Sequence, residues 1–275
     1  MFYQQSIGDS SKAFYITITS IDFARQGGHD CLMKKQSLLL AAWIFALPMA
    51  ARAGTLQLFT ENTPPDIMRE GERITGISTD KVKEIMSRAG IKYTMEIMAW
   101  KRAYELALRT PNSCVFSTSR TPEREALFKW VGPLREFDWT LYGLANSPVQ
   151  LATLDDAKKL RIGGYNGDVR VQYLQDRGFT VDVAPDNFSN PRKLMGGRID
   201  LWVTSHQLAH GLIEREGLVG KIVPLLTFHT SRAYLACNKA VPDATIAAMS
   251  AAMADILKDG TAAAIDRKYA NWPLR

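Results

Sequence analysis

The chain has little cysteine, with three residues among 275, too few for a small fold held together by disulfides. It also lacks long apolar runs: none approaches the roughly 18 residues that a membrane-spanning helix needs. P-loop, dinucleotide-binding and Gly-x-Ser-x-Gly motifs are missing as well. What is present is typical of a folded globular protein, with 46% hydrophobic and 23% charged residues, which excludes disorder, collagen and coiled coil.

An apolar run over 38–47 follows two lysines and precedes a proline and the sequence Ala51-Arg52-Ala53. This order of basic, short apolar and small residues is typical of a secretory signal peptide. We expect residues 33–53 to be the signal peptide, and the mature chain to lie in the periplasm. Residues 1–32 are then expected to be a misassigned N-terminal extension, with translation starting at Met33. A buried core helix is the alternative for the apolar run.

The net charge of the chain is +6, which by itself suggests a nucleic-acid or anionic partner. Residues 1–53 carry five of the 34 basic and three of the 28 acidic side chains, so the mature chain keeps a net charge of +4. Its basic residues are scattered without a run. We therefore expect no nucleic-acid partner.

Two cysteines, Cys114 and Cys237, remain after removal of the segment that holds Cys31. Each lies in an apolar run typical of a strand, and the periplasm permits disulfides. They are either two buried free thiols or one bridge, and the sequence favours neither.

Strand and helix patterns alternate from residue 54 on. Strands are predicted over 55–60, 91–97 and 114–118, with amphipathic helices between them, the first capped by Ser78 or Thr79. A strand–helix–strand–helix–strand order predicts a parallel, doubly wound sheet, because the connections are right-handed crossovers.

The same pattern occurs a second time, with strands predicted over 160–164, 179–183 and 199–204. Residues 139–145 lead from the first half to the second, and residues near 228–237 lead back. No low-complexity linker separates the halves. We therefore expect an α/β fold of two doubly wound lobes, joined by a two-strand hinge, with a cleft between them. The expected boundaries are 54–145 plus 230–275 for lobe 1, and 146–229 for lobe 2.

Residues that directly follow the predicted strands are the candidate ligand-binding residues, because doubly wound sheets bind ligands beyond the carboxyl ends of their strands. An arginine on the first turn of a helix suits a carboxylate, since it offers paired donors beside free backbone N–H groups. Trp100 and Tyr165 are expected to form flat walls of the cleft, and Trp202 to lie in the core. The candidates are Glu61, Trp100, Ser117, Ser119, Arg124, Tyr165, Gly167, Asp168, Thr204 and Ser205.

The sequence Thr-Ser-Arg-Thr-Pro-Glu-Arg at 118–124, followed by Phe-Lys-Trp-Val-Gly-Pro at 128–133, resembles the motif of the family 3 extracellular solute-binding proteins. These are the type II periplasmic receptors of amino acid ABC transporters. Gly76-Ile77-Ser78 and Gly197-Arg198-Ile199-Asp200 add to the resemblance, which spans 55–272. It implies a type II periplasmic-binding fold and a monomer that captures a small amino acid-like or carboxylate solute for a membrane permease. It implies no cofactor and no catalysis.

The resemblance also assigns roles. In the family the arginine of the motif binds the α-carboxylate of the ligand, which places Arg124 there, with Ser117 and Ser119 beside it. A solvated arginine paired with Glu123 or Asp80 is the alternative for Arg124.

Three departures from the family pattern concern the ligand. The family tends to have an aromatic residue in the first loop, where this chain has Thr63. The family commonly places an acidic residue, which binds the ammonium group, where this chain has Thr204-Ser205. A family Gly-Thr pair is replaced by Gly167-Asp168, and Asp168 either supplies the missing anion or caps its own helix. The ligand is therefore an amino acid bound in an unusual way or another small carboxylate.

Two other functions remain open on the same scaffold. Cyclohexadienyl dehydratases resemble these receptors, and Glu61 or Asp168 would then serve as general acid or base. A ligand-sensing receptor for a membrane signalling partner is the other. His206, His210 and Glu214 share a helix face but lack a fourth ligand, so we expect a solvated face there.

Overall fold

The computed structural model describes residues 54–270. The extension expected over 1–32 and the signal peptide expected over 33–53 lie outside the described residues. Within the described part, every helix is too short or too polar to cross a membrane. From residue 54 on, helices and strands alternate as the sequence pattern predicts.

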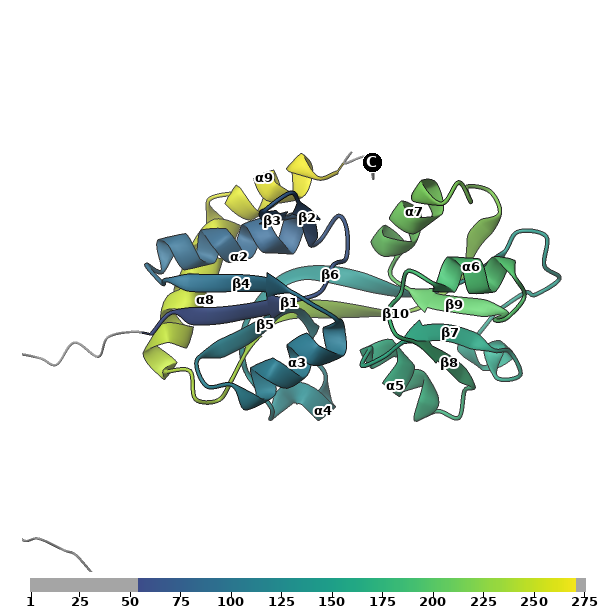
Figure 1. The fold of residues 1–275 in the computed structure, drawn as a ribbon, viewed down its shortest axis with the longest axis horizontal. Helices are drawn as coiled ribbons and strands as arrows, with labels where there is room; N and C mark the ends of the chain where they lie inside the picture. The colour runs from purple at the N-terminus through teal and green to yellow at the C-terminus, as the bar shows by residue number, and fades with distance from the viewer. Residues whose placement is uncertain (1–53, 271–275) are drawn as a thin grey trace, which may run out of the picture. The chain divides into compact units, whose positions relative to one another are not determined.

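A mixed sheet of eight strands has the order β4-β1-β5-β10-β6-β9-β7-β8 (Figure 1). β1 pairs in parallel with β4 and β5, and β7 pairs in parallel with β8 and β9. The doubly wound pattern therefore occurs twice, as predicted. The strands are β1 (Leu56–Thr60), β4 (Tyr93–Ile97), β5 (Ser113–Ser119), β6 (Lys129–Leu144), β7 (Ile162–Tyr165), β8 (Val181–Ala184), β9 (Leu201–Thr204) and β10 (Ile222–Cys237).

Two long antiparallel strands, β6 and β10, connect the two parallel groups. Each has 16 residues, and they pair with one another along most of their length. β10 also pairs with β5, and β6 also pairs with β9. The two crossing segments predicted from the sequence are therefore present, and both start earlier than expected, at Lys129 and Ile222.

Helices cover both faces of the β4-β1-β5 group (Figure 1). On one face α2 and α8 pack through Val82, Met86, Met249 and Ile256, which are fully buried. On the other face α3 packs through Ala103 and its neighbours. Burial of these apolar stripes stabilises the half of the chain that carries Glu61 and Ser117. The helices are α2 (Ile77–Arg88), α3 (Trp100–Arg109), α4 (Pro122–Glu125), α8 (Asp243–Lys258) and α9 (Thr261–Lys268).

The β8-β7-β9 group is covered by shorter helices. Trp202 on β9 is fully buried against Leu194, Leu208 and Leu212. Its indole N–H donates to the side-chain oxygen of Asn187 at 2.7 Å, so the core position expected for Trp202 is confirmed. The helices are α5 (Val169–Gln175), α6 (Asn190–Met195), α7 (His206–Arg215) and the 3-10 helix η2 (Leu154–Ala157).

The start of α2 differs from the prediction. The helix begins at Ile77 with Gly76 as its N-cap, not at Ser78 or Thr79. Gly76 has φ 123°, and a Cβ there would lie 2.4 Å from the backbone oxygen of Asp66, so only glycine fits. A short hairpin of β2 (Met68–Glu70) and β3 (Arg73–Thr75) precedes it and was not predicted, because three-residue strands carry too little periodicity.

The question of the two cysteines is decided in favour of the bridge. Cys114 on β5 and Cys237 on β10 are direct partners across the antiparallel pair, and their sulfur atoms are bonded. Both side chains are fully buried. The disulfide therefore joins positions that are 123 residues apart in the sequence.

Candidate functional site

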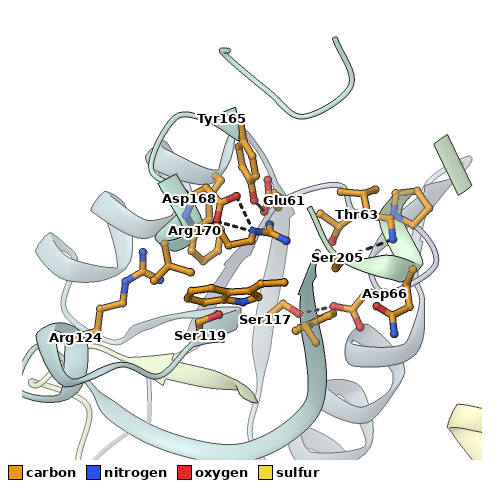
Figure 2. A pocket seen from close by; sticks show the side chains of 17 residues that line it. Glu61, Thr63, Asp66, Ser117, Ser119, Arg124, Tyr165, Asp168, Arg170 and Ser205 are labelled. Atoms are coloured by element: carbon orange, nitrogen blue, oxygen red, sulfur yellow. Dashed lines mark hydrogen bonds and ion pairs between the residues drawn. The ribbon is translucent and has the colours of Figure 1, made fainter. Parts of the chain in front are cut away.

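The ends of β1, β5, β7 and β9 meet at one pocket, whose cavity volume is about 70 Å³ (Figure 2). The residues that follow these strands lie close together because parallel strands present their carboxyl ends at one edge of a sheet. The predicted site residues that line the pocket are Glu61, Trp100, Ser117, Ser119, Arg124, Tyr165, Asp168 and Ser205.

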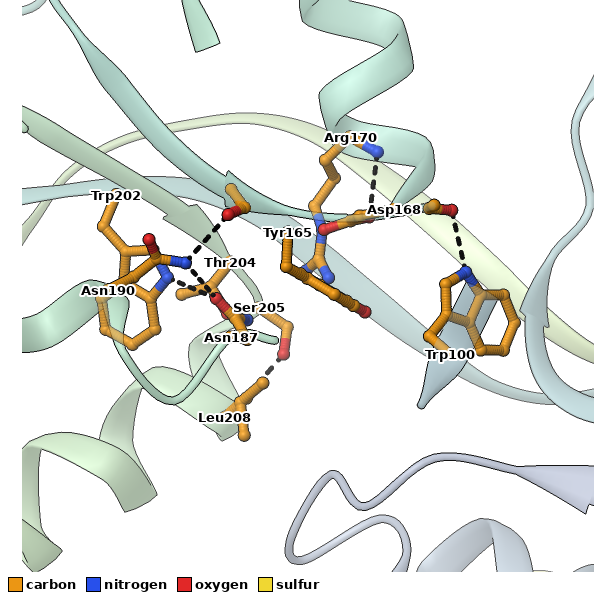
Figure 3. A network of polar contacts seen from close by, with 12 residues as sticks. Trp100, Tyr165, Asp168, Arg170, Asn187, Asn190, Trp202, Thr204, Ser205 and Leu208 are labelled. Atoms are coloured by element: carbon orange, nitrogen blue, oxygen red, sulfur yellow. Dashed lines mark hydrogen bonds and ion pairs between the residues drawn. The ribbon is translucent and has the colours of Figure 1, made fainter. Parts of the chain in front are cut away.

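Two predicted site residues lie elsewhere. Thr204 is fully buried, and its hydroxyl accepts a hydrogen bond from the side-chain nitrogen of Asn187 at 3.0 Å (Figure 3). Side chains alternate along a strand, so Ser205 reaches the pocket and Thr204 does not. Gly167 lies beside the pocket, and its carbonyl accepts from the indole N–H of Trp100 at 2.8 Å.

Arg124 stands on the short helix α4, at the pocket wall. Its guanidinium lies 4.8 Å from the ring centre of Tyr104, and one nitrogen is 3.4 Å from the carbonyl oxygen of Gly167. Burial lowers the pKa of Arg124 from its usual value. Among residues 54–270, no carboxylate forms an ion pair with it, and Asp80 pairs with Lys268 instead. Arg124 is therefore a partly desolvated cation that no carboxylate of residues 54–270 pairs with directly.

Asp66 forms a second feature, which the sequence patterns did not reveal. Its side chain is 4% exposed, and the carboxylate accepts from the backbone N–H and hydroxyl of Ser78, at 3.2 and 2.6 Å. It also accepts from the hydroxyl of Ser117 and from Arg135 at 3.0 Å. Ser117 consequently turns its hydroxyl toward Asp66 and not toward the centre of the pocket (Figure 2).

Asp168 caps its own helix, one of the two roles that the sequence left open. It accepts from the backbone N–H of Arg170 at 3.0 Å. The side chain of Arg170 also donates to both carboxylate oxygens, at 3.0 and 2.9 Å (Figure 3). Asp168 is 4% exposed. This carboxylate is therefore already neutralised within its own helix, by an arginine that sequence reasoning missed.

Glu61 is the remaining carboxyl group of the pocket. Its Oε1 accepts from the hydroxyl of Tyr165 at 2.7 Å. Burial, reinforced by the nearby charges of Asp168 and Asp186, raises the pKa of Glu61 to about 8, although the Tyr165 hydrogen bond and Arg170 act in the opposite direction. Glu61 is therefore uncharged at neutral pH.

A family model matches residues 56–271, nearly all of the chain from residue 54 on, and its description is bacterial extracellular solute-binding proteins, family 3. The chain belongs to this family. The resemblance stated from the loop at 118–124 is thereby confirmed. No curated protein shows a significant sequence match to this solute-binding protein.

Solved structures support the fold of this family 3 protein. A histidine kinase sensor domain with similarity to periplasmic binding proteins matches with a TM-score of 0.74 at 18% identity, over 80% of this chain and 97% of that one. An ancestral arginine-binding protein bound to arginine matches with 0.69 at 22%, over 78% and 98%. The GluR0 ligand-binding core from Nostoc punctiforme matches with 0.68 at 17%, over 78% and 98%. The fold is the type II periplasmic-binding fold.

Four aromatic side chains contribute to the walls of the pocket in this solute-binding protein. Trp100 and Tyr165, both predicted, are joined by Phe137 and Trp139 of β6. The sequence placed Trp139 in a crossing strand but gave no sign that its side chain lines the pocket. Such flat surfaces suit an apolar or conjugated ligand body.

Replacing Glu61 by glutamine is expected to stabilise the protein in a pH-dependent way. The folded protein binds the Glu61 proton up to about pH 8, whereas an unfolded chain releases it near pH 4.5. Stability of the native protein therefore falls as pH rises between these values, and glutamine removes the loss. Thermal unfolding should show almost no difference at pH 4 and a gain of about 4 kcal/mol at pH 7.5. The exposed Glu96→Gln variant is the control, and equal gains at both pH values would contradict the expectation.

Proposed function

We propose that this protein captures a small amino acid-like or carboxylate solute in the pocket, for uptake by an ABC transporter, and that it does so as a periplasmic monomer without catalysis. Arg124 is the observation that carries the proposal. A partly desolvated guanidinium with no carboxylate partner in the described part of the chain has a strong electrostatic reason to bind an anion, and it lies against the aromatic ring of Tyr104.

Capture is proposed to occur between two lobes, 54–145 plus 230–275 and 146–229, with β6 and β10 as the hinge. Hydrogen bonds at the pocket join residues of the proposed lobes, among them those from Tyr165 to Glu61, from Trp100 to Gly167 and from Arg124 to Gly167. When the two lobes close over a ligand, they bury it and present one defined shape to a permease.

A thermal-shift screen of amino acids and small organic acids tests this proposal. A ligand at 100 times its dissociation constant is expected to stabilise the protein by about 2.7 kcal/mol. Arg124→Gln is expected to weaken binding of that ligand about 100-fold, because the charge-assisted hydrogen bonds are lost.

Arg120→Gln is the matched control, since Arg120 lies in the same loop but is exposed and paired with Glu125 at 2.6 Å. Equal losses in the two variants, or a screen without any shift, would show that Arg124 is not the anchor.

A dehydratase is the second candidate, and the state of Glu61 favours it. A neutral carboxyl in an aromatic pocket is suited to act as a general acid. Incubation with prephenate or arogenate decides between a dehydratase and a binding protein. Loss of substrate with the native protein but not with Glu61→Gln would establish catalysis.

The membrane partner of the protein distinguishes a sensory role from a role in transport. Capture of an ABC permease on the immobilised, ligand-loaded protein supports transport, whereas capture of a membrane kinase or chemoreceptor supports signalling.

A further inference from the structure

Two of the three carboxyl groups that line the pocket are already paired with an arginine of the protein. Asp66 accepts four hydrogen bonds, one of them from Arg135 at 3.0 Å. Asp168 accepts three hydrogen bonds, all from the backbone and side chain of Arg170. Turning either carboxylate toward a ligand ammonium would strand an arginine in the interior.

The two arginines are themselves enclosed. The side chains of Arg135 and Arg170 are 12% and 11% exposed, and their carboxylate partners are 4% and 3% exposed. Each pair therefore balances its own charge inside the protein, and neither contributes a net charge to the pocket.

Glu61 adds no negative charge at neutral pH. The ionisable groups that act on it are Tyr165, Asp168, Arg170 and Asp186. Its oxygen is already engaged by the Tyr165 hydroxyl. The two ion pairs and the neutral Glu61 sum to zero, so the net charge of the pocket is that of Arg124.

A neutral polar group completes the pocket. Gln207 on α7 lines it, and the side-chain oxygen of Gln207 is buried with no hydrogen-bond partner among the described residues. Such an acceptor is suited to a neutral donor on a ligand, such as a hydroxyl.

From this charge balance we propose that the ligand is a monocarboxylate that carries a neutral hydrogen-bonding group, such as a hydroxyl, in place of an ammonium group, on a flat or apolar body. The carboxylate pairs with Arg124, the neutral group meets Gln207, and the body lies against Trp100, Phe137 and Trp139. This inference rests on the proposed capture function, which by itself allows amino acids equally.

Matched ligand pairs test the inference by titration calorimetry on the full chain at pH 6.5. Each pair exchanges only hydroxyl for ammonium: L-phenyllactate with L-phenylalanine, L-2-hydroxy-4-methylpentanoate with L-leucine, and L-lactate with L-alanine. The hydroxy acid is expected to bind at least about tenfold more tightly wherever a pair binds, because it brings no unpaired cation into the pocket. A tighter amino acid would overturn the inference and leave the capture function standing. Binding by none of the pairs would overturn this ligand class, and the broader screen would then decide the capture function separately.

The sign of the pH dependence is a second readout. Ionisation of Glu61 above pH 7 adds a negative charge to the pocket that holds the bound carboxylate, so affinity for the hydroxy acid should fall up to about fourfold between pH 6.5 and 8.5. A ligand whose ammonium pairs with Glu61 would gain affinity over the same range. Glu61→Gln is expected to abolish the pH dependence, and a rise in affinity with pH in the native protein would overturn the inference.

Discussion

Replacing Cys114 and Cys237 together by alanine is expected to lower the free energy of unfolding by about 4 kcal/mol. The disulfide closes a loop of 123 residues, and a crosslink over so long a loop removes much of the conformational entropy of the unfolded chain. The two sulfur atoms are also fully buried between β5 and β10, so their removal leaves a small cavity that adds to the loss.

Urea unfolding measures this effect. The midpoint should fall and the slope should rise, because an unfolded chain without the crosslink exposes more surface. Reductant should destabilise the native protein to a similar extent and leave the alanine variant unchanged. An unchanged midpoint in the variant would show that the cysteines are free thiols.

Arg135→Met is expected to lower the free energy of unfolding by about 3 kcal/mol. Methionine keeps most of the side-chain volume but leaves the carboxylate of Asp66, whose side chain is 4% exposed, without its counter-charge. Removing one partner of a buried ion pair is costly because the other charge stays in the interior. The hydrogen bonds from Ser78 and Ser117 to Asp66 remain and limit the loss.

Two further variants isolate this interaction. Arg232→Met, on the neighbouring strand, breaks an exposed pair with Glu136 and should have little effect. Adding Asp66→Asn to Arg135→Met should recover part of the stability, because the buried charge is removed. Equal losses in Arg135→Met and Arg232→Met would contradict the assigned role of the pair.

Strand-end position correctly predicted which side chains lie together at the pocket, whereas their binding of a ligand stays a prediction. Glu61, Ser119, Tyr165 and Ser205 follow strands whose apolar runs are easily recognised, and the parallel pairing brings their ends together. It failed at Thr204, because a one-residue difference along a strand reverses the direction of the side chain.

The ion-pair partners of Asp66 and Asp168 could not be predicted from the sequence. Asp66 and Arg135 are 69 residues apart, and neither belongs to a motif. Arg170 lies only two residues from Asp168, yet helical spacing gives no sign that its side chain folds back onto the cap.

The sequence by itself determined the family, the α/β fold with two doubly wound groups, and the loop that carries Arg124. These follow from local periodicity, strand-end position and motif spacing, which are properties of short segments. Only the tertiary structure decided the Cys114–Cys237 bridge, the internal pairing of Asp66 and Asp168, and the uncharged state of Glu61. Charge state and pairing depend on burial and on groups brought together from distant parts of the chain, and these same quantities shape the class of ligand that we infer.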